Sequence, residues 1–297
     1  MTDTKRVNYL ACAQGKQTKN RQPPRMDSGL NSPIDMIRGL VCSDLKGPLT
    51  PRDRLENRYL VNFIDHRSNY CQVFLAKTKD AAGMHFKHFL VAFERQFKVR
   101  IHVLRTDGGG EYKPLDLFCK EANVSSQVSD RDNQASNRKA ERMHRTIMNM
   151  VQSIVFASGF PLTFWGDAAE YSTYILNRSP TKANEGGISP IEMMTNKRSV
   201  LNDFVVFGSP CTIHLMTANK SLGARWKPAI IIGKDDEMKE YRVFIPIERF
   251  VVVTQHVKNV ETLNDVQGRD INKMSHDTDG QHGNKNVTSN TKTRSSG

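Results

Sequence analysis

Long hydrophobic runs and an even set of cysteines are both missing from this sequence. Its 297 residues contain no stretch of about 18 apolar residues, which excludes a conventional transmembrane helix and gives no reason to expect a membrane partner. The opening residues MTDTKRVNYL lack the apolar core of a secretory signal, so we do not expect secretion. The five cysteines are scattered and odd in number, which argues against a disulfide framework and fits a reducing compartment.

Acidic residues are also in short supply. The chain has 31 Asp+Glu against 43 Lys+Arg, a formal net charge of +12, and this excess favours a polyanionic partner such as nucleic acid. Residues 1–33 are polar, contain proline and form a basic arm without an apolar pattern. Residues 264–297 contain no aromatic side chain and almost no aliphatic ones, so we expect this tail to be disordered.

The region between the arm and the tail shows two patterns in succession. Short runs rich in β-formers predict strands at about 37–43, 59–65, 70–76 and 100–106, the middle two forming a hairpin. Apolar residues at helical spacing predict helices at about 81–97, 137–158 and 162–177. We therefore expect an α/β layered domain at 34–195. Four strand-like runs between 204 and 260 then predict a small β-rich module at 200–263.

Three acidic residues occupy suggestive positions in the α/β region. Asp44 ends the first predicted strand, Asp107 ends the fourth, and Glu141 lies near the start of the second helix. The ends of neighbouring strands are where such a sheet brings distant side chains together. Each acid also has a structural interpretation, because Asp44 and Asp107 precede turn residues and Glu141 could pair with Arg145 one helical turn later. Position alone leaves both interpretations open.

Motifs around the three acids supply further information. SDLKGP, FIDHRSNYCQVF, LRTDGGGEY, NRKAERMHRT and FWGDAAEYSTYILNRSP follow one another in this order, and the segments after residue 189 continue the pattern. Together they resemble the integrase region of copia-type LTR retrotransposon polyproteins over roughly residues 9–261. The resemblance implies an RNase H-like fold, with a mixed five-stranded sheet flanked by helices, followed by the β-rich module.

The resemblance also implies a chemistry for the three acids. Asp44, Asp107 and Glu141 map onto the family's metal-binding carboxylates, which would hold two Mg²⁺ (or Mn²⁺) ions. The implied activity is DNA integration: water trims the DNA ends, and the exposed 3′-hydroxyl then attacks target DNA. The implied partners are element ends, target DNA and further copies of the chain, and the implied place of action is the nucleus, entered from the cytoplasm.

Cations near Glu141 are candidates for holding the DNA backbone. We predict DNA contacts from four residues around the start of the glutamate-bearing helix: Asn137, Lys139, Arg142 and Arg145. Arg145 keeps two interpretations, a phosphate contact or the ion pair with Glu141. In the β-rich module, Arg225, Lys227 and Lys234 form either a second DNA contact or a solvated face. Asp65 also matches a family position, but we expect it to support the hairpin.

Three departures from the family pattern qualify this interpretation. Ser136-Asn137-Arg138 replaces the usual Gln-Asn-Gly, and Asp-Gly-Gly-Gly-Glu at 107–111 replaces Asp-Asn-Gly-Gly-Glu. Tyr9 stands where the family's zinc module has a cysteine, and no histidine precedes Cys12, so we do not expect zinc binding by this chain. Residues 1–33 would then be a remnant of that module. Two alternatives stay open: a catalytically inactive, element-derived DNA-binding protein, and a ribonuclease H, which fits the downstream module less well.

Overall fold

The computed structural model of the chain describes most of the region between the arm and the tail. The described residues are 39–112, 115–128, 138–199, 201, 204–214, 226–235 and 240–258. The predicted basic arm at 1–33 and the predicted disordered tail at 264–297 lie outside them. Within the described residues, no helix is both long enough and apolar enough to cross a bilayer.

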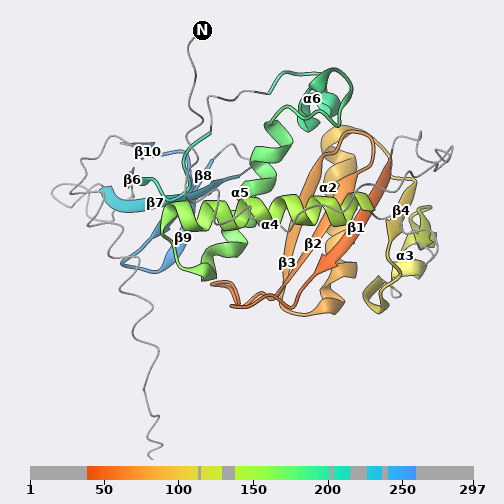
Figure 1. The fold of residues 1–297 in the computed structure, drawn as a ribbon, viewed down its shortest axis with the longest axis horizontal. Helices are drawn as coiled ribbons and strands as arrows, with labels where there is room; N and C mark the ends of the chain where they lie inside the picture. Colours follow the sequence, from red (N-terminus) through yellow and green to blue (C-terminus); the bar gives the residue numbers. More distant parts are fainter. Residues whose placement is uncertain are drawn as a thin grey trace, which may run out of the picture.

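The first sheet is mixed and has the strand order β3-β2-β1-β4-β5 (Figure 1). Its strands are β1 (Leu40–Lys46), β2 (Tyr59–Asp65), β3 (Cys71–Ala76), β4 (Val103–Thr106) and β5 (Ser125–Val128). The pairs β1–β2 and β2–β3 are antiparallel, whereas β1–β4 and β4–β5 are parallel. The predicted hairpin is therefore confirmed as β2–β3. Asp65 supports its turn as expected, because its Oδ2 accepts hydrogen bonds from Ser68 N at 2.7 Å and Ser68 Oγ at 2.6 Å.

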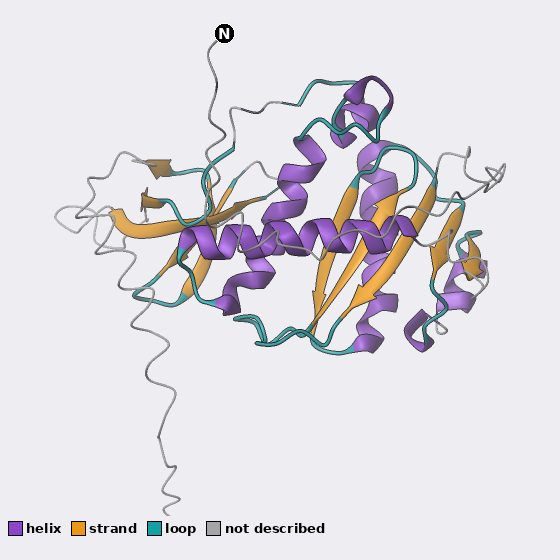
Figure 2. Cartoon of the chain, in the orientation of Figure 1, coloured by secondary structure: helices purple, strands orange, loops and turns teal. Residues whose placement is uncertain are grey.

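Helices cover both faces of this sheet (Figure 2). The helices are α2 (Ala82–Phe97), α3 (Leu115–Glu121), α4 (Arg138–Ser158), α5 (Trp165–Arg178) and the short α6 (Pro190–Thr195). Because side chains alternate along a strand, Val41 packs with Phe86 of α2 while its neighbour Cys42 packs with Ala140 of α4. The prediction of a mixed five-stranded sheet flanked by helices is confirmed.

Short 3₁₀ turns complete the connections. They are η2 (Lys79–Ala81), η3 (Gly110–Tyr112), η5 (Leu162–Phe164) and η6 (Glu185–Gly187). The helix predicted at 162–177 begins as η5 and continues as α5. One detail of the sequence prediction was wrong: β1 continues for two residues past Asp44, to Lys46, so Asp44 lies inside the strand.

The second sheet is antiparallel throughout, in the order β10-β6-β7-β8-β9. Its strands are β6 (Pro210–His214), β7 (Trp226–Lys234), β8 (Tyr241–Ile245), β9 (Phe250–Thr254) and β10 (Val257–Lys258). This confirms the predicted all-β module, and the last predicted run proves to be two strands. The boundaries proposed for the domains stay predictions.

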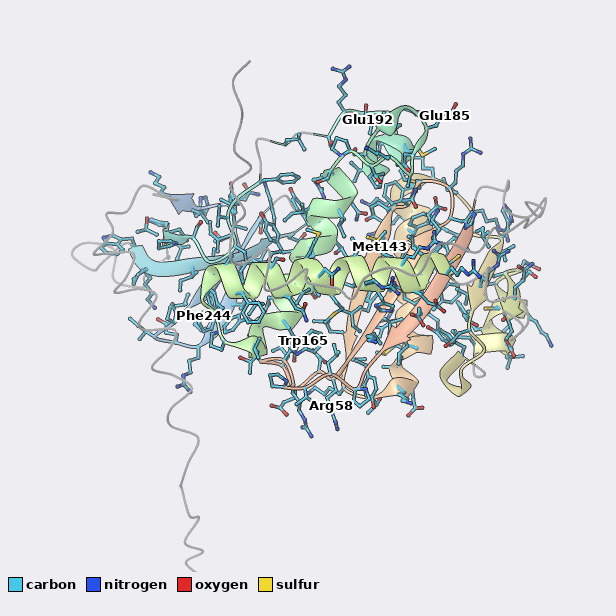
Figure 3. The ribbon with its side chains drawn as sticks, in the orientation of Figure 1. Arg58, Met143, Trp165, Glu185, Glu192 and Phe244 are labelled. Atoms are coloured by element: carbon cyan, nitrogen blue, oxygen red, sulfur yellow. The ribbon has the colours of Figure 1, made fainter. Side chains whose placement is uncertain are left out.

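The long helix α4 connects the two sheets. It crosses the strands of the first sheet, and its C-terminal half reaches the second (Figure 1). Val151 and Val155 of α4 share one buried cluster with Trp165 of α5 and with Ile230 and Phe244 of the second sheet (Figure 3 labels Trp165 and Phe244). The start of α4 is thereby held against the first sheet by a helix anchored at both ends.

Candidate active site

Asp44 and Asp107 lie on adjacent parallel strands. Leu40 pairs with Val103 and Cys42 pairs with Arg105, an offset of 63 positions that also separates Asp44 from Asp107. Asp107 directly follows β4, where its Oδ1 accepts a hydrogen bond from Gly109 N at 3.1 Å. Since neighbouring strands run about 4.8 Å apart, the sheet places these two carboxylates side by side.

Glu141 approaches the same place from the covering helix. It lies in the first turn of α4, beside Ala140, which is completely buried against β1. The buried amide of Asn62 on β2 links these parts: its Oδ1 accepts from Asp44 N at 3.0 Å, and its Nδ2 donates to Ala140 O at 2.9 Å. Asn62 therefore fixes the first turn of α4 over the strand that carries Asp44.

The pKa of Asp44 responds to its burial and to the charges of the other two acids. Burial, followed by the negative charges of Asp107 and Glu141, raises the pKa of the Asp44 carboxyl to about 6, against the opposing effects of a hydrogen bond from the Leu45 main chain and of the Lys46 charge. The side chain of Asp44 is 16% exposed, whereas Asp107 and Glu141 are exposed. Asp44 near the end of β1, Asp107 directly after β4 and Glu141 at the start of α4 thus form one acidic patch at the carboxyl ends of these two strands.

His144 stands directly behind Asp44. Its Nε2 donates a hydrogen bond to the main-chain oxygen of Asp44 at 2.9 Å and lies 3.6 Å from the carboxylate Oδ2. Burial lowers the pKa of His144 to about 4, so the ring is neutral at pH 7. Its Nδ1 is buried with no hydrogen-bond partner among the described residues. His144 acts on Asp44 as a donor and not as a counter-charge.

Hard oxygen ligands in this patch suit a divalent cation. Carboxylates are the protein ligands that Mg²⁺ prefers, and a cation would relieve the repulsion from Asp107 and Glu141 that adds to burial in raising the pKa of Asp44. Among the described residues, no three His, Cys, Asp or Glu side chains form a ready metal-binding group. The assignment of Asp44, Asp107 and Glu141 as catalytic metal ligands stays a prediction.

The predicted DNA contacts lie around the start of α4. Lys139 donates to the main-chain oxygen of His66, and Arg142 and Arg145 are exposed. Within the described part of the chain, Arg145 makes no ion pair with Glu141, and its phosphate contact stays a prediction. Asn137 lies outside the described residues.

The cations of the β-rich module have local partners. Lys227 pairs with Glu248, and the Lys234 ammonium lies 5.0 Å from the centre of the Tyr241 ring. Arg225 lies outside the described residues. Both interpretations of this group, a DNA contact and a solvated face, stay open.

Two residues of the site, His144 and Asn62, are not among those that the sequence motifs predicted. His144 comes three positions after Glu141, a spacing that places both on neighbouring parts of one helix surface. Asn62 is the one amide in the otherwise apolar run YLVNFI. A polar side chain in a buried strand requires a hydrogen-bond partner, and that requirement was the available signal.

Comparisons with known proteins find relatives for most of the chain. The model of the retroviral polymerase SH3-like domain matches residues 209–272. The retrovirus-related Pol polyprotein from transposon TNT 1-94 of Nicotiana tabacum is 31% identical over 259 residues, which are 86% of this chain and 19% of that protein. The corresponding polyprotein from transposon RE1 of Arabidopsis thaliana is 25% identical over 253 residues, 84% of this chain and 17% of that protein.

Among solved structures, the HTLV-2 integrase catalytic core domain, determined in complex with magnesium in a trimeric form, aligns with 52% of this chain and 95% of its own. Its TM-score is 0.40 and its sequence identity 13%. The chain spans about a fifth of the length of the plant polyproteins. The predicted relationship is confirmed: over most of its length, this chain is homologous to the retrovirus-related Pol polyproteins of plant transposons.

Proposed function

We propose that the chain is the integrase of a copia-type element, a polynucleotidyl transferase that processes DNA 3′ ends and joins them to target DNA. The observation that carries this proposal is the placement of Asp44 and Asp107 on paired parallel strands, with Glu141 in the helical turn that Asn62 ties to Asp44. The charges of Asp107 and Glu141 add to burial in raising the pKa of the Asp44 carboxyl. Structural acids in a basic protein have no reason to gather at one sheet edge, because each adds to the repulsion on the others. The homology to retrovirus-related Pol polyproteins supports the same activity.

Asp44, Asp107 and Glu141 would hold the divalent ions. When bound, two Mg²⁺ ions supply activation of the attacking oxygen and stabilisation of the leaving one in an in-line displacement at phosphorus. The chain's own contribution is positional. Asn62 and His144 fix the main chain of Asp44, so its carboxylate keeps one orientation relative to α4.

The exposed cations of α4 would hold the substrate. Arg145 lies one helical turn after Glu141, so a phosphate backbone that it binds passes close to the carboxylates, and the exposed Arg142 lies beside that path. We further propose that the active protein is a multimer, because joining two DNA ends to one target requires two such sites. We also propose that it acts in the nucleus, as its resemblance to the integrase region implies.

A strand-transfer assay on the full chain tests the activity. The parent protein with Mg²⁺ or Mn²⁺ should convert labelled element-end DNA into joined product, and Glu141→Gln should reduce that product by at least about a hundredfold. Glu121→Gln, at an exposed position on α3 away from the site, serves as the matched control and should keep parental activity. Equal product from the parent and Glu141→Gln would show that the catalytic assignment is wrong.

A second readout separates the proposal from its alternatives. Mg²⁺ should raise the melting temperature of the parent but not of Glu141→Gln, since only the parent keeps all three carboxylates. Salt-sensitive DNA binding with no metal response and no product would support the inactive DNA-binding protein instead. Preferred cleavage of RNA–DNA hybrids over DNA ends would support the ribonuclease H.

A further inference from the structure

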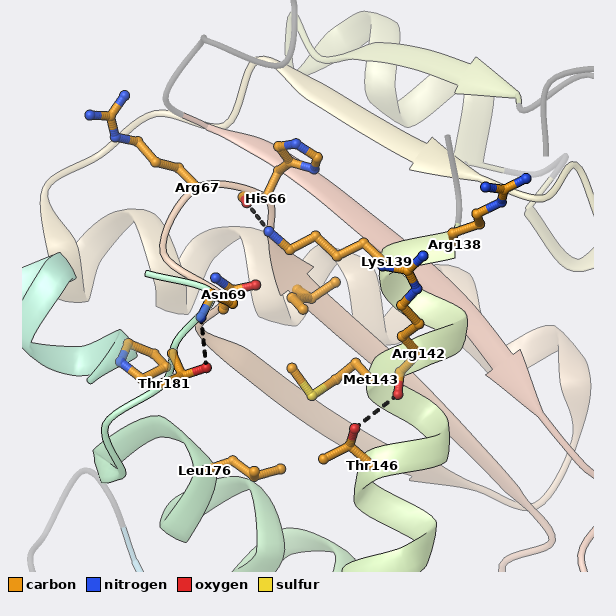
Figure 4. Close-up of a pocket in the computed structure, with 13 residues that line it drawn as sticks. His66, Arg67, Asn69, Arg138, Lys139, Arg142, Met143, Thr146, Leu176 and Thr181 are labelled. Atoms are coloured by element: carbon orange, nitrogen blue, oxygen red, sulfur yellow. Dashed lines mark hydrogen bonds between the residues drawn. The ribbon is translucent and has the colours of Figure 1, made fainter. Parts of the chain in front are cut away.

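A cationic pocket lies on the flank of α4 that faces away from the carboxylates. The cavity has a volume of about 600 Å³ and lies between α4, the β2–β3 turn, the end of α5 and the segment that leads to α6 (Figure 4). Binding sites for small ligands usually occupy about 300–1,000 Å³, so this one can take a group of nucleotide size.

The rim of the pocket is strongly positive. Arg67 comes from the β2–β3 turn, and Arg138, Lys139 and Arg142 come from the first turns of α4 (Figure 4). None of the described residues that line the pocket is acidic. Arg67 and Arg142 are exposed, and neither makes an ion pair with any residue that the structure describes. Such a cluster favours an anionic ligand.

The floor of the pocket is apolar. Ile64 of β2, Met143 of α4 and Leu176 of α5 line it, and Thr146 borders it on α4 (Figure 4). Lys139 bridges from α4 to the main-chain oxygen of His66, which fixes the turn against the helix. A ligand that fits this pocket combines a negative group at the rim with a flat or apolar group on the floor.

Helix geometry relates the pocket to the carboxylates. At 100° per residue, Lys139, Met143 and Thr146 lie on one side of α4, and Glu141 and His144 lie on the other. Arg142 lies on the exposed crest between them. A nucleic-acid strand held along this crest can therefore place one nucleotide near Glu141 and a neighbouring one in the pocket.

We propose that this pocket binds an unpaired nucleotide of the DNA end, with its phosphate against Arg67 and Arg142 and its base against Met143 and Leu176. Apolar side chains and guanidinium planes are the groups against which proteins stack unpaired bases. A base within a duplex cannot enter, because its faces are covered by the neighbouring base pairs and its edge by its partner base. The inference rests on the proposed function, since it assumes that DNA lies over α4.

A filling substitution tests the cavity without changing its charge. Thr146→Phe places a ring in the pocket from an exposed helix position. The full chain should bind a duplex with a short single-stranded overhang more tightly than the same duplex with blunt ends. Thr146→Phe should weaken overhang binding by at least about fivefold and blunt-duplex binding by much less, because stacking of a single base contributes about that much. Fluorescence anisotropy at one fixed salt concentration measures both affinities.

A charge substitution and its control complete the design. Arg67→Gln should also reduce overhang binding, whereas Arg95→Gln, at an exposed position on α2 across the sheet, should not. If the parent binds both duplexes equally, or Thr146→Phe keeps the overhang preference, the pocket assignment is wrong while DNA binding by the chain stands. If neither duplex binds, the proposed function itself fails. If an acidic, phenylalanine-containing peptide binds in place of the overhang and Thr146→Phe abolishes that binding, the occupant is a protein and this proposal is wrong.

Discussion

His144 holds Asp44 through a hydrogen bond of 2.9 Å from its ring Nε2 to the main-chain oxygen, with the Asp44 carboxylate only 3.6 Å away. The pKa values of the two groups shift in opposite directions. Burial and the neighbouring acids raise the pKa of Asp44 to about 6, and burial lowers the pKa of His144 to about 4. Folding therefore favours the neutral form of both groups. The contribution of Asp44 to stability falls as the pH rises, whereas the contribution of His144 falls as the pH drops.

Asp44→Asn should stabilise the metal-free protein at neutral pH. A carboxyl whose folded pKa is raised contributes stability below its ordinary pKa of 3.8 and loses it as the pH rises through about 6. Replacing it should therefore increase the free energy of unfolding by about 1–3 kcal/mol at pH 7, and the gain should vanish near pH 4. Urea unfolding in EDTA at both pH values measures this, with the exposed Asp80→Asn as the control. A gain of equal size at both pH values would contradict the assignment.

His144→Gln should make the protein less sensitive to acid. The lowered pKa of His144 means that its contribution to stability is complete above pH 6.5 and is lost as the pH falls towards 4. Glutamine can donate the same hydrogen bond to Asp44 O but cannot be protonated. The fall in unfolding free energy between pH 7 and pH 4 should thus be about 2–3 kcal/mol smaller in the variant than in the parent. Parallel pH profiles for the two proteins would show that His144 does not titrate in this way.

The sequence could predict the elements with strong periodicity. The apolar spacing in α2 and the β-rich runs of β2 and β3 follow from burial, and the structure has them within a residue or two of the expected bounds. No sequence pattern predicts β5, whose residues SSQV are mostly polar and exposed at the edge of the sheet. An exposed edge strand lacks the alternation on which such a prediction depends.

The acidic residues of the candidate site could be predicted from the sequence, but their positions relative to one another could not. Asp44, Asp107 and Glu141 could be chosen from their positions and motifs. The pairing offset of 63 that sets Asp44 beside Asp107 depends on long-range strand pairing. Register is decided by packing across the whole sheet, so a local pattern cannot give it. The same holds for Asn62 and His144, whose partners are 18 and 100 positions away.

Asn62→Ala should loosen the connection between β1 and α4. The substitution removes the acceptor for Asp44 N and the donor to Ala140 O inside a fully buried site. Leaving such groups without partners should cost about 2–3 kcal/mol of unfolding free energy. The Mg²⁺-dependent rise in melting temperature should also shrink, because the carboxylates would no longer be held together. The half-buried Asn149→Ala on α4 is the control, and an unchanged response to Mg²⁺ in Asn62→Ala would refute the positioning role.

Asp167→Asn should weaken the junction between the two sheets. Asp167 of α5 is buried and accepts hydrogen bonds from Arg54 Nε at 2.7 Å and from Arg242 of β8 at 3.0 Å. Removing its charge leaves the partly buried Arg54 without this acidic partner and Arg242 with Glu170 alone, which should cost about 3 kcal/mol of unfolding free energy.

The matched control for this junction is the exposed ion pair between Arg52 and Glu56, which lies in the same β1–β2 connection as Arg54. Glu56→Gln breaks the contact of 2.8 Å between Arg52 and Glu56, and it should cost less than about 1 kcal/mol, because solvent screens the pair. Limited proteolysis should also cut Asp167→Asn between residues 195 and 210 faster than the parent, since Arg242 then keeps only its ion pair with Glu170 as a charged contact to α5. Comparable losses for both variants would mean that the buried cluster contributes no more than a surface ion pair.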